Sequence, residues 1–280
     1  NRQDLETLAA ALKSLSTWHA LDTLQECREA TGGAGFLAEN RLTALRSDLD
    51  IYVTFEGDNT VLLQLVAKRL LADYAKEFQG ADFGVLARYV VGQATERTFH
   101  RTGLRQIVQT VADTGSEKKS AIALRDPRTQ HDLLADRVAT MVAEVAGELQ
   151  KARKLPKAEA AAVFNRNQHD LIEAARAHAE LLQWEAFTRV LERIEDEGTR
   201  QVVTWLRDLF GLGLIEKNLA WYLMHGRLSS QRARTLGEYV NRLLAKIRPH
   251  AMDLVNAFGY GPEHLRAAVA TGAEKQRQDE

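Results

Sequence analysis

The segment 27–60 holds the residues whose types and spacing could support chemistry. Gly32, Gly33 and Gly35 form a Gly-Gly-x-Gly turn, and the run Thr-Phe-Glu-Gly-Asp-Asn follows at 54–59. Glycine has no Cβ, so such a turn lets a ligand approach the backbone closely. Glycines at this spacing also simply reverse a chain, and the spacing alone does not separate the two interpretations.

Glu56 is the candidate general base of this segment. Its neighbours Tyr52, Val53, Phe55 and Gly57 are mostly apolar. A carboxylate in apolar surroundings has a raised pKa and can accept a proton from a weakly acidic substrate. The competing interpretation is that Glu56 only caps the helix that follows it.

A helix is predicted to begin directly after this candidate base. Apolar residues recur at helical spacing over 61–78, and Asp58 or Asn59 is a natural N-cap. The first backbone N–H groups of that helix could bind an anion. The residues just upstream, 50–55, are β-branched and aromatic, and they predict a short strand or a buried extended turn.

The elements that must position these residues are predicted to be helices. The chain has 280 residues, 45% of them hydrophobic, and only 4 prolines, so it can build a helical core. The fold class expected is therefore all-α. Helical periodicity is expected over 5–18, 21–30, 40–46, 61–78, 85–112, 129–154, 158–197, 199–210, 213–225, 229–258 and 262–266.

Composition and charge exclude several classes of function. Lys+Arg is 37 and Asp+Glu is 38, which argues against nucleic acid or an anionic membrane as the main partner. No apolar stretch is long enough to span a membrane. One cysteine, Cys27, excludes an internal disulfide, and the scattered histidines lack metal-binding spacing, so no metal is expected. The chain opens without Met inside a helical pattern, so we expect a C-terminal piece of a longer protein.

Residues 24–71 resemble the C-terminal α-domain of acyl-CoA oxidases, in the acyl-CoA dehydrogenase superfamily. The run at 54–59 carries the resemblance, because most dehydrogenases have Tyr-Glu-Gly-Thr there. Residues 248–251 and 254–259 are similar to the second helical domain, which dehydrogenases lack. The resemblance implies a helical bundle followed by an oxidase-type C-terminal helical domain. The first domain, 1–85, would be the second half of the dehydrogenase-like domain with the catalytic base, and 86–280 the oxidase domain.

The resemblance also implies roles for the second motif. In the family the Glu of the Glu-Gly pair removes the α-proton of a fatty acyl-CoA thioester while the β-hydrogen leaves as hydride to the flavin. That role falls on Glu56. Gly57 would lie against the thioester, and Asp58, Asn59 and Thr60 would contact FAD.

The glycine turn takes its role from the same resemblance. In the family this turn approaches the adenosine end of FAD, commonly across a subunit interface, and here it consists of Gly32, Gly33 and Gly35. Dehydrogenases place Gln three residues before it. Glu29 stands at that position here, which leaves that one FAD contact in doubt.

The function implied is that of an FAD-dependent acyl-CoA oxidase, which forms trans-2-enoyl-CoA and reduces O2 to hydrogen peroxide in fatty acid β-oxidation. The alternatives are an acyl-CoA dehydrogenase that passes electrons to a carrier protein, and a non-catalytic helical interaction module. The expected partners are a second copy in a homodimer or higher oligomer, and the N-terminal and β-domains, without which the fragment would be inactive. The Ala/Arg/Leu-rich composition and the Gln-Asp-Glu ending, in place of Ser-Lys-Leu, predict a bacterial, cytoplasmic protein.

Overall fold

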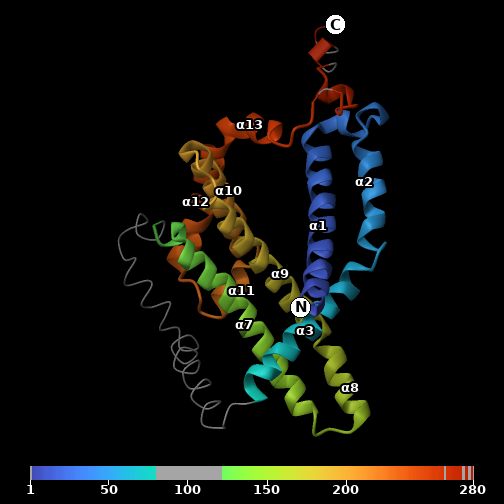
Figure 1. Ribbon diagram of the computed structural model, residues 1–280, viewed down its shortest axis with the longest axis vertical. Helices are drawn as coiled ribbons and strands as arrows, with labels where there is room; N and C mark the ends of the chain where they lie inside the picture. The colour runs from blue at the N-terminus through green and yellow to red at the C-terminus, as the bar shows by residue number, and fades with distance from the viewer. Residues whose placement is uncertain (1, 80–121, 262, 273–274, 277–278, 280) are drawn as a thin grey trace. The chain divides into compact units, whose positions relative to one another are not determined.

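The computed structural model describes residues 2–79, 122–261, 263–272, 275–276 and 279. Every regular element in this described part is an α-helix or a 3-10 helix (Figure 1), which confirms the predicted all-α class. The helix predicted over 85–112 and the domain boundary predicted at 85/86 lie outside the described residues. That boundary stays a prediction.

The described elements follow one another along the chain with short connections. They are α1 (Arg2–Ala30), η1 (Gly32–Phe36), η2 (Ala38–Asn40), α2 (Leu42–Asp50), η3 (Ile51–Val53), α3 (Asn59–Gln79), α7 (Pro127–Ala152), α8 (Lys157–Arg166), α9 (Gln168–Leu191), α10 (Glu197–Lys217), α11 (Leu219–Met224), α12 (Ser230–Ile247), η4 (Arg248–His250), α13 (Ala251–Asn256) and η5 (Ala268–Ala270).

Tertiary contacts divide the chain into two compact units. Unit 1 comprises Asn1–Val66 and Ala251–Glu280, and unit 2 comprises Ala67–His250, so the division falls inside α3. In unit 1, α2 lies beside the long helix α1 (Figure 1). The predicted helices 5–18 and 21–30 are one helix of 29 residues, because no glycine or proline interrupts the chain between them. At about 1.5 Å per residue, α1 is roughly 43 Å long.

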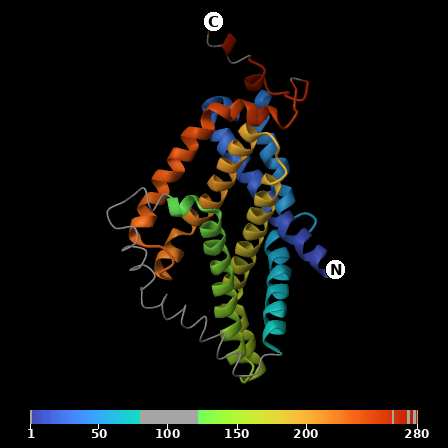
Figure 2. The ribbon, with the colours of Figure 1, turned by 60° about the vertical axis from the view of Figure 1, so that its left-hand side comes forward.

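Unit 2 is a helical bundle in which α7 packs along α9 and α10 packs on α9 and α12 (Figure 2). Its core is apolar, and Trp184 is buried there, while Trp205 and Trp221 pack against it half-buried. The fully buried large side chains of this core are Leu124, Leu212, Ile215, Tyr222, Leu228, Leu236 and Leu243. Burial of such side chains is the main source of stability in a bundle of this kind.

A buried polar cluster ties three helices of unit 2 together. Asp208 accepts hydrogen bonds from Arg207 Nε at 2.9 Å and from Gln130 Nε2 at 3.2 Å. Trp184 Nε1 donates to Gln130 Oε1 at 3.2 Å. Burial raises the pKa of Asp208, and the neighbouring Arg207 opposes that shift. Each polar side chain of this cluster thus has a hydrogen-bond partner, as a buried polar group requires.

Glycine explains one difference from the predicted helix boundaries. The sequence predicts a break near Gly211, but α10 continues through it. A Cβ at Gly211 would lie 2.5 Å from Trp184 Nε1, so this glycine allows close packing of α10 on α9. In contrast, the helix predicted over 158–197 is divided at Asn167 and ends at Leu191. Ser229 is the N-cap of α12, because its Oγ accepts from Arg232 N at 3.2 Å.

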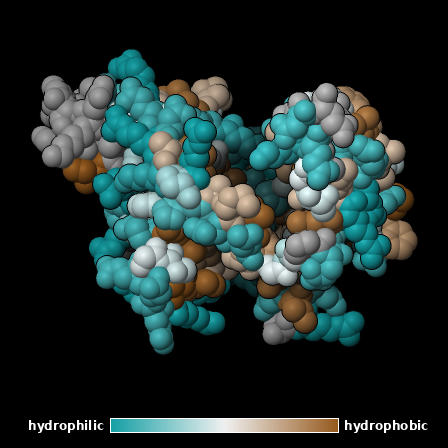
Figure 3. Space-filling model, turned by 90° about the horizontal axis from the view of Figure 1, so that it is seen from above, coloured by the Kyte–Doolittle hydropathy of each residue, from teal (hydrophilic) through white to brown (hydrophobic). Residues whose placement is uncertain are grey.

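Hydrophobic side chains also remain on the surface. Figure 3 shows them in brown as separate patches among the teal hydrophilic residues. In unit 1 the large exposed ones include Leu5, Phe36, Ile51, Phe55, Val61, Met252 and Phe258. So many exposed apolar side chains on one small unit are typical of a surface that packs against further protein.

Candidate functional site

The chain leading to Glu56 is helical. α2 ends at Asp50, a 3-10 turn covers Ile51–Val53, and Phe55 N donates to Ile51 O at 2.8 Å. Tyr52 and Phe55 are exposed, with their rings edge to face at 6.3 Å. The predicted strand or buried extended turn at 50–55 is therefore wrong. β-branched and aromatic residues favour strands only where a neighbouring strand covers them, and the described residues offer none.

Glu56 and Gly57 form a turn of unusual backbone geometry. Their φ angles are 56° and 108°. A non-glycine residue in the left-handed region costs about 1 kcal/mol or more, and it persists only where the surroundings hold it. Gly57 must be glycine, because a Cβ there would meet Leu62 at 3.1 Å in a backbone conformation that L residues rarely adopt.

Helix α1 holds this turn by hydrogen bonds. Lys13 Nζ donates to Gly57 O at 2.6 Å and to Asn59 Oδ1 at 2.8 Å. Asn59 is only 1% exposed, and its Nδ2 donates to Ser14 O at 3.2 Å and to Thr17 Oγ1 at 2.9 Å. The Asn59 side chain is thus fully engaged with α1, which leaves only its backbone for the flavin contact that the sequence predicts.

Asp58 caps α3, as the sequence predicts. Its Oδ1 accepts from Thr60 N at 2.9 Å and from Val61 N at 3.2 Å. These two donors are therefore already satisfied. The anion site expected at this helix start lacks them, because the Asp58 carboxylate takes the place that an anion would occupy.

The Glu56 side chain is exposed to solvent, whereas the sequence predicts that apolar residues surround it. Sequence neighbours that are apolar do not surround a carboxylate when they point outward, as Tyr52 and Phe55 do. A base that attacks a carbon acid needs a site from which water is excluded. The walls of such a site have to come from protein beyond the described residues.

The three glycines of the first motif lie in η1, directly after α1, and they differ in what surrounds them. Gly32 has a φ of 57°, which fits a glycine at a helix C-terminus. A Cβ at Gly35 would clash with Arg28 O and Thr31 Oγ1. No heavy atom of the described residues lies within 4 Å of a Cβ built on Gly33, whose side of the turn is open.

Asn40 is a buried link that sequence reasoning missed. It is 3% exposed, its Nδ2 donates to Ala34 O at 2.8 Å, and its Oδ1 accepts from Val269 N at 2.8 Å. The C-terminal turn η5 thereby supports the glycine turn. Nothing local marks Asn40, because its second partner lies 229 residues further along the chain.

Lys13 was also missed, although a signal exists. Ala10, Lys13, Ser14 and Thr17 follow the i, i+3, i+4, i+7 spacing of one helix face, and three of these four are polar. A polar stripe where a helix should present an apolar face predicts partners on a neighbouring element.

Glu29 lies on the exposed last turn of α1. Its Oε1 accepts from Gln25 Nε2 at 2.5 Å and lies 3.4 Å from a guanidinium nitrogen of Arg28. The FAD contact assigned to Glu29 stays a prediction.

The two motifs lie at different levels along α1. Lys13 contacts the Glu56 turn, and Arg28 packs at the glycine turn, with its guanidinium 4.6 Å from the Phe36 ring centroid. Fifteen residues separate Lys13 from Arg28, which corresponds to roughly 22 Å along the axis at about 1.5 Å per residue. Only an extended ligand, or two ligands, could use both turns.

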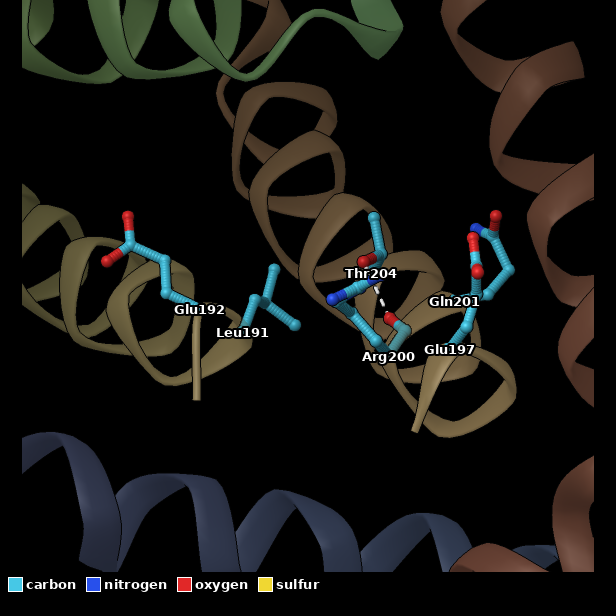
Figure 4. A pocket seen from close by; sticks show the side chains of 6 residues that line it. All are labelled: Leu191, Glu192, Glu197, Arg200, Gln201 and Thr204. Atoms are coloured by element: carbon cyan, nitrogen blue, oxygen red, sulfur yellow. Dashed lines mark hydrogen bonds between the residues drawn. The ribbon is translucent and has the colours of Figure 1, made fainter. Parts of the chain in front are cut away.

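A separate hollow of about 290 Å³ occurs in unit 2 (Figure 4). Its walls come from the end of α9 and the start of α10, namely Leu191, Glu192, Glu197, Arg200, Gln201 and Thr204. Thr204 Oγ1 donates to Arg200 O at 2.7 Å, the dashed line of Figure 4. Within the described ranges there is no cluster of three or more side chains suited to a metal ion, and no helix is long and apolar enough to cross a membrane.

Comparison with known protein families identifies the family of this chain. A sequence profile described as "Acyl-CoA oxidase" matches residues 126–271, which is more than half of the chain. The chain belongs to the acyl-CoA oxidase family. A second profile, "Acyl-CoA oxidase, C-alpha1 domain", matches residues 1–71 and confirms the resemblance carried by the segment with the candidate base.

Relatives of this oxidase chain are found in plants and animals. Acyl-coenzyme A oxidase 2, peroxisomal, of Arabidopsis thaliana is 33% identical over 276 residues, covering 98% of this chain and 38% of that protein. Peroxisomal acyl-coenzyme A oxidase 1 of Homo sapiens is 27% identical over 259 residues, covering 92% and 37%. The chain therefore spans about two fifths of the length of these curated relatives.

Solved structures share the fold of this oxidase chain. Acyl-CoA oxidase 1 of Arabidopsis thaliana matches with a TM-score of 0.76 and 26% identity over 95% of this chain and 38% of that one. An acyl-CoA oxidase of Caenorhabditis elegans, bound with FAD, ascaroside-CoA and ATP, has a TM-score of 0.74 at 20% identity, over 95% and 36%. FAD is thus a cofactor of this family.

The prediction of a bacterial, cytoplasmic protein is wrong. Several of the relatives are named peroxisomal oxidases and come from plants and animals. Enrichment in Ala, Arg and Leu reflects the helix propensity of these residues and carries no information about the organism. The missing Ser-Lys-Leu ending informs on targeting only if the last residue given is the last residue of the protein.

Proposed function

We propose that this chain is the C-terminal part of an FAD-dependent acyl-CoA oxidase in which Glu56 is the catalytic base. The whole enzyme would convert a fatty acyl-CoA to trans-2-enoyl-CoA and reduce O2 to hydrogen peroxide. The observation that carries the proposal is the turn at Glu56 and Gly57, where a carboxylate is held in the left-handed region by contacts from another helix. A strained backbone angle of this kind at a non-glycine residue is typical of functional sites.

The chemistry assigned to this chain is a proton transfer. The Glu56 carboxylate takes the α-proton of the thioester as the bond from that proton to Cα breaks. FAD, when bound, would supply the acceptor for the β-hydrogen as hydride and the route by which both electrons reach O2, which takes up two protons to become hydrogen peroxide. The Cα–H electron pair becomes the new double bond between Cα and Cβ. The carboxyl of Glu56 later returns its proton to solvent.

Gly57 would lie against the thioester, the role that the family resemblance assigns to the residue after the base. The residues proposed to hold FAD are Glu29, Gly32, Gly33, Gly35, Asp58, Asn59 and Thr60. The open side of Gly33 supports this assignment, because neither its backbone angle nor a neighbour within 4 Å requires glycine there. The separation of roughly 22 Å between the two turns supports either one extended dinucleotide or two flavins in a dimer.

The remaining partners follow from the length and surface of the chain. We infer that 1–85 and 86–280 are its two domains, and that a homodimer and the N-terminal and β-domains of the parent enzyme complete the site. The exposed apolar side chains of unit 1 support such contacts. The peroxisomal names of its relatives favour a peroxisomal enzyme.

Glu56→Gln in the complete enzyme tests the proposal. The amide keeps the size of the side chain and cannot accept the α-proton, so turnover should fall by at least about a thousandfold at full flavin content. Flavin absorbance and peroxide release under air are the measurements. Turnover within a few-fold of wild type shows that Glu56 is not the base, and reduction of a dye without peroxide favours a dehydrogenase.

A further inference from the structure

The strained turn at Glu56 needs a support that acts on its backbone. The φ angles of 56° and 108° at Glu56 and Gly57 set the direction in which the Glu56 side chain leaves the chain. If the peptide that follows Gly57 could rotate freely, Glu56 would relax towards the right-handed region, which L residues prefer. The carboxylate would then move away from the place the turn gives it.

Lys13 supplies this support from α1. Its side chain is half-buried, and its ammonium donates to Gly57 O at 2.6 Å and Asn59 Oδ1 at 2.8 Å. Both acceptors are neutral oxygens, one on the Gly57 backbone and one on the Asn59 side chain, and among the described residues Lys13 forms no ion pair with Glu56. Hydrogen bonds from a charged donor are about twice as strong as neutral ones.

The attachment of α3 to α1 does not depend on Lys13. Three further hydrogen bonds join Asn59 to α1: two from its Nδ2, to Ser14 O and Thr17 Oγ1, and one from Ser14 Oγ to Asn59 O at 3.2 Å. Removal of the ammonium leaves these bonds in place. What is lost is the hold on the Gly57 carbonyl, which directly follows the strained residue.

We propose that Lys13 is a positioning residue that keeps the carboxylate of Glu56 in its productive place by holding the Gly57 carbonyl. This inference rests on the proposed function of Glu56 as the base. Displacement of a catalytic group by about 1 Å can cost about a hundredfold in rate, so a residue that touches no substrate can still control the chemical step.

Lys13→Met in the complete enzyme is the first test, because methionine keeps most of the aliphatic stem and removes the donors. The probes are butanoyl-, octanoyl- and hexadecanoyl-CoA, with peroxide release measured under air. We expect kcat on the best of these to fall about 10- to 100-fold, with KM within about threefold and flavin content unchanged. Lys13→Arg, which keeps charge and donors, should recover most of the loss. Lys151→Met removes one exposed lysine of α7 and should change nothing.

A kcat of Lys13→Met within twofold of wild type overturns the proposal, and so does a loss that lies wholly in flavin content. If Lys13→Met does not retain flavin, the milder Lys13→Gln decides: a kcat at least about fivefold below wild type at full flavin content is expected, and an unchanged one overturns the proposal. Comparison of the two single variants, Lys13→Met and Glu56→Gln, separates the positioning role of Lys13 from the proposed role of Glu56 as the base. An inactive Glu56→Gln with a fully active Lys13→Met rejects only the positioning role, whereas an active Glu56→Gln rejects the base itself.

In the Glu56→Gln background, Lys13→Met should cause no further loss of residual turnover, because a residue that acts through the carboxylate has nothing left to position. A second full loss of 10- to 100-fold in that background would instead show that Lys13 acts on the reaction independently, contrary to the proposal.

Discussion

The three glycines of η1 differ in whether the fold itself requires a glycine at that position. Gly35 is crowded by Arg28 O and Thr31 Oγ1, and Gly32 has a φ of 57°, so both are required by the fold. Gly33 has neither constraint, so its side of the turn is free for the FAD contact proposed above.

We predict that Gly33→Ala preserves the melting temperature of the complete enzyme but lowers its flavin content after gel filtration. Gly35→Ala should cost about 1 to 3 kcal/mol of stability, because the added methyl overlaps main-chain atoms. Gly147→Ala on α7, where an added Cβ meets no neighbouring atom within 4 Å, is the control: it should leave flavin content unchanged and raise the melting temperature slightly, because alanine is about 1 kcal/mol more favourable than glycine inside a helix. Full flavin retention by Gly33→Ala argues against the FAD contact.

Local motifs at the residue scale were predictable, and long-range contacts were not. Asp58 as N-cap follows from its place before a helical pattern, and Ser229 does so in the same way. The polar stripe on α1 signals that Lys13 has a partner, but it does not identify that partner, which lies 44 residues away. Asn40 has a partner 229 residues away, and no local pattern reveals that pair. The roles of Glu56 and the glycines rest on resemblance, and the variants above test them.

Helix α1 is the element that relates the two motifs, because each turn is held by its own part of that helix. The glycine turn has a second support in η5, through Asn40. Helix periodicity predicts that these elements exist, but not where all of them end. Helix α10 continues past its predicted end because Gly211 packs closely on α9, and α1 is one helix because no glycine or proline interrupts it.

Asn40→Ala should weaken the glycine turn. It removes the partner of Val269 N and one of the two hydrogen bonds to Ala34 O, which still accepts from Leu37 N. Loss of a hydrogen bond of this kind costs about 0.5 to 1.5 kcal/mol. We expect a lower melting temperature together with faster flavin loss on dilution. Asn40→Asp keeps the acceptor for Val269 N and loses only the donor, so its effect should be intermediate; an effect equal to that of alanine contradicts the two-sided link.

At the scale of the whole molecule, the fold class could be predicted because helix formers dominate the composition. The division into two units could not, since it depends on contacts between residues 1–66 and 251–280. The walls that the proposed base requires also lie beyond the described residues, so they could not be predicted from its sequence neighbours.

The chain of 280 residues should therefore release no peroxide on its own. The Glu56 carboxylate is exposed, and proton abstraction from a thioester needs a site from which water is excluded. Peroxide assay of the purified chain with added FAD and octanoyl-CoA, beside the complete enzyme, is the measurement. Turnover by the isolated chain above the level of its Glu56→Gln variant contradicts this expectation.

The link from Asn40 to Val269 has a consequence for synthesis on the ribosome. The amide of Val269 is made 229 residues after the side chain that binds it. At about 5 to 20 residues per second, the glycine turn waits roughly 10 to 50 seconds for its second support. The nascent chain thus carries an incomplete glycine turn while the residues between Asn40 and Val269 are being added, and the FAD contact proposed for that turn would gain its second support only after that.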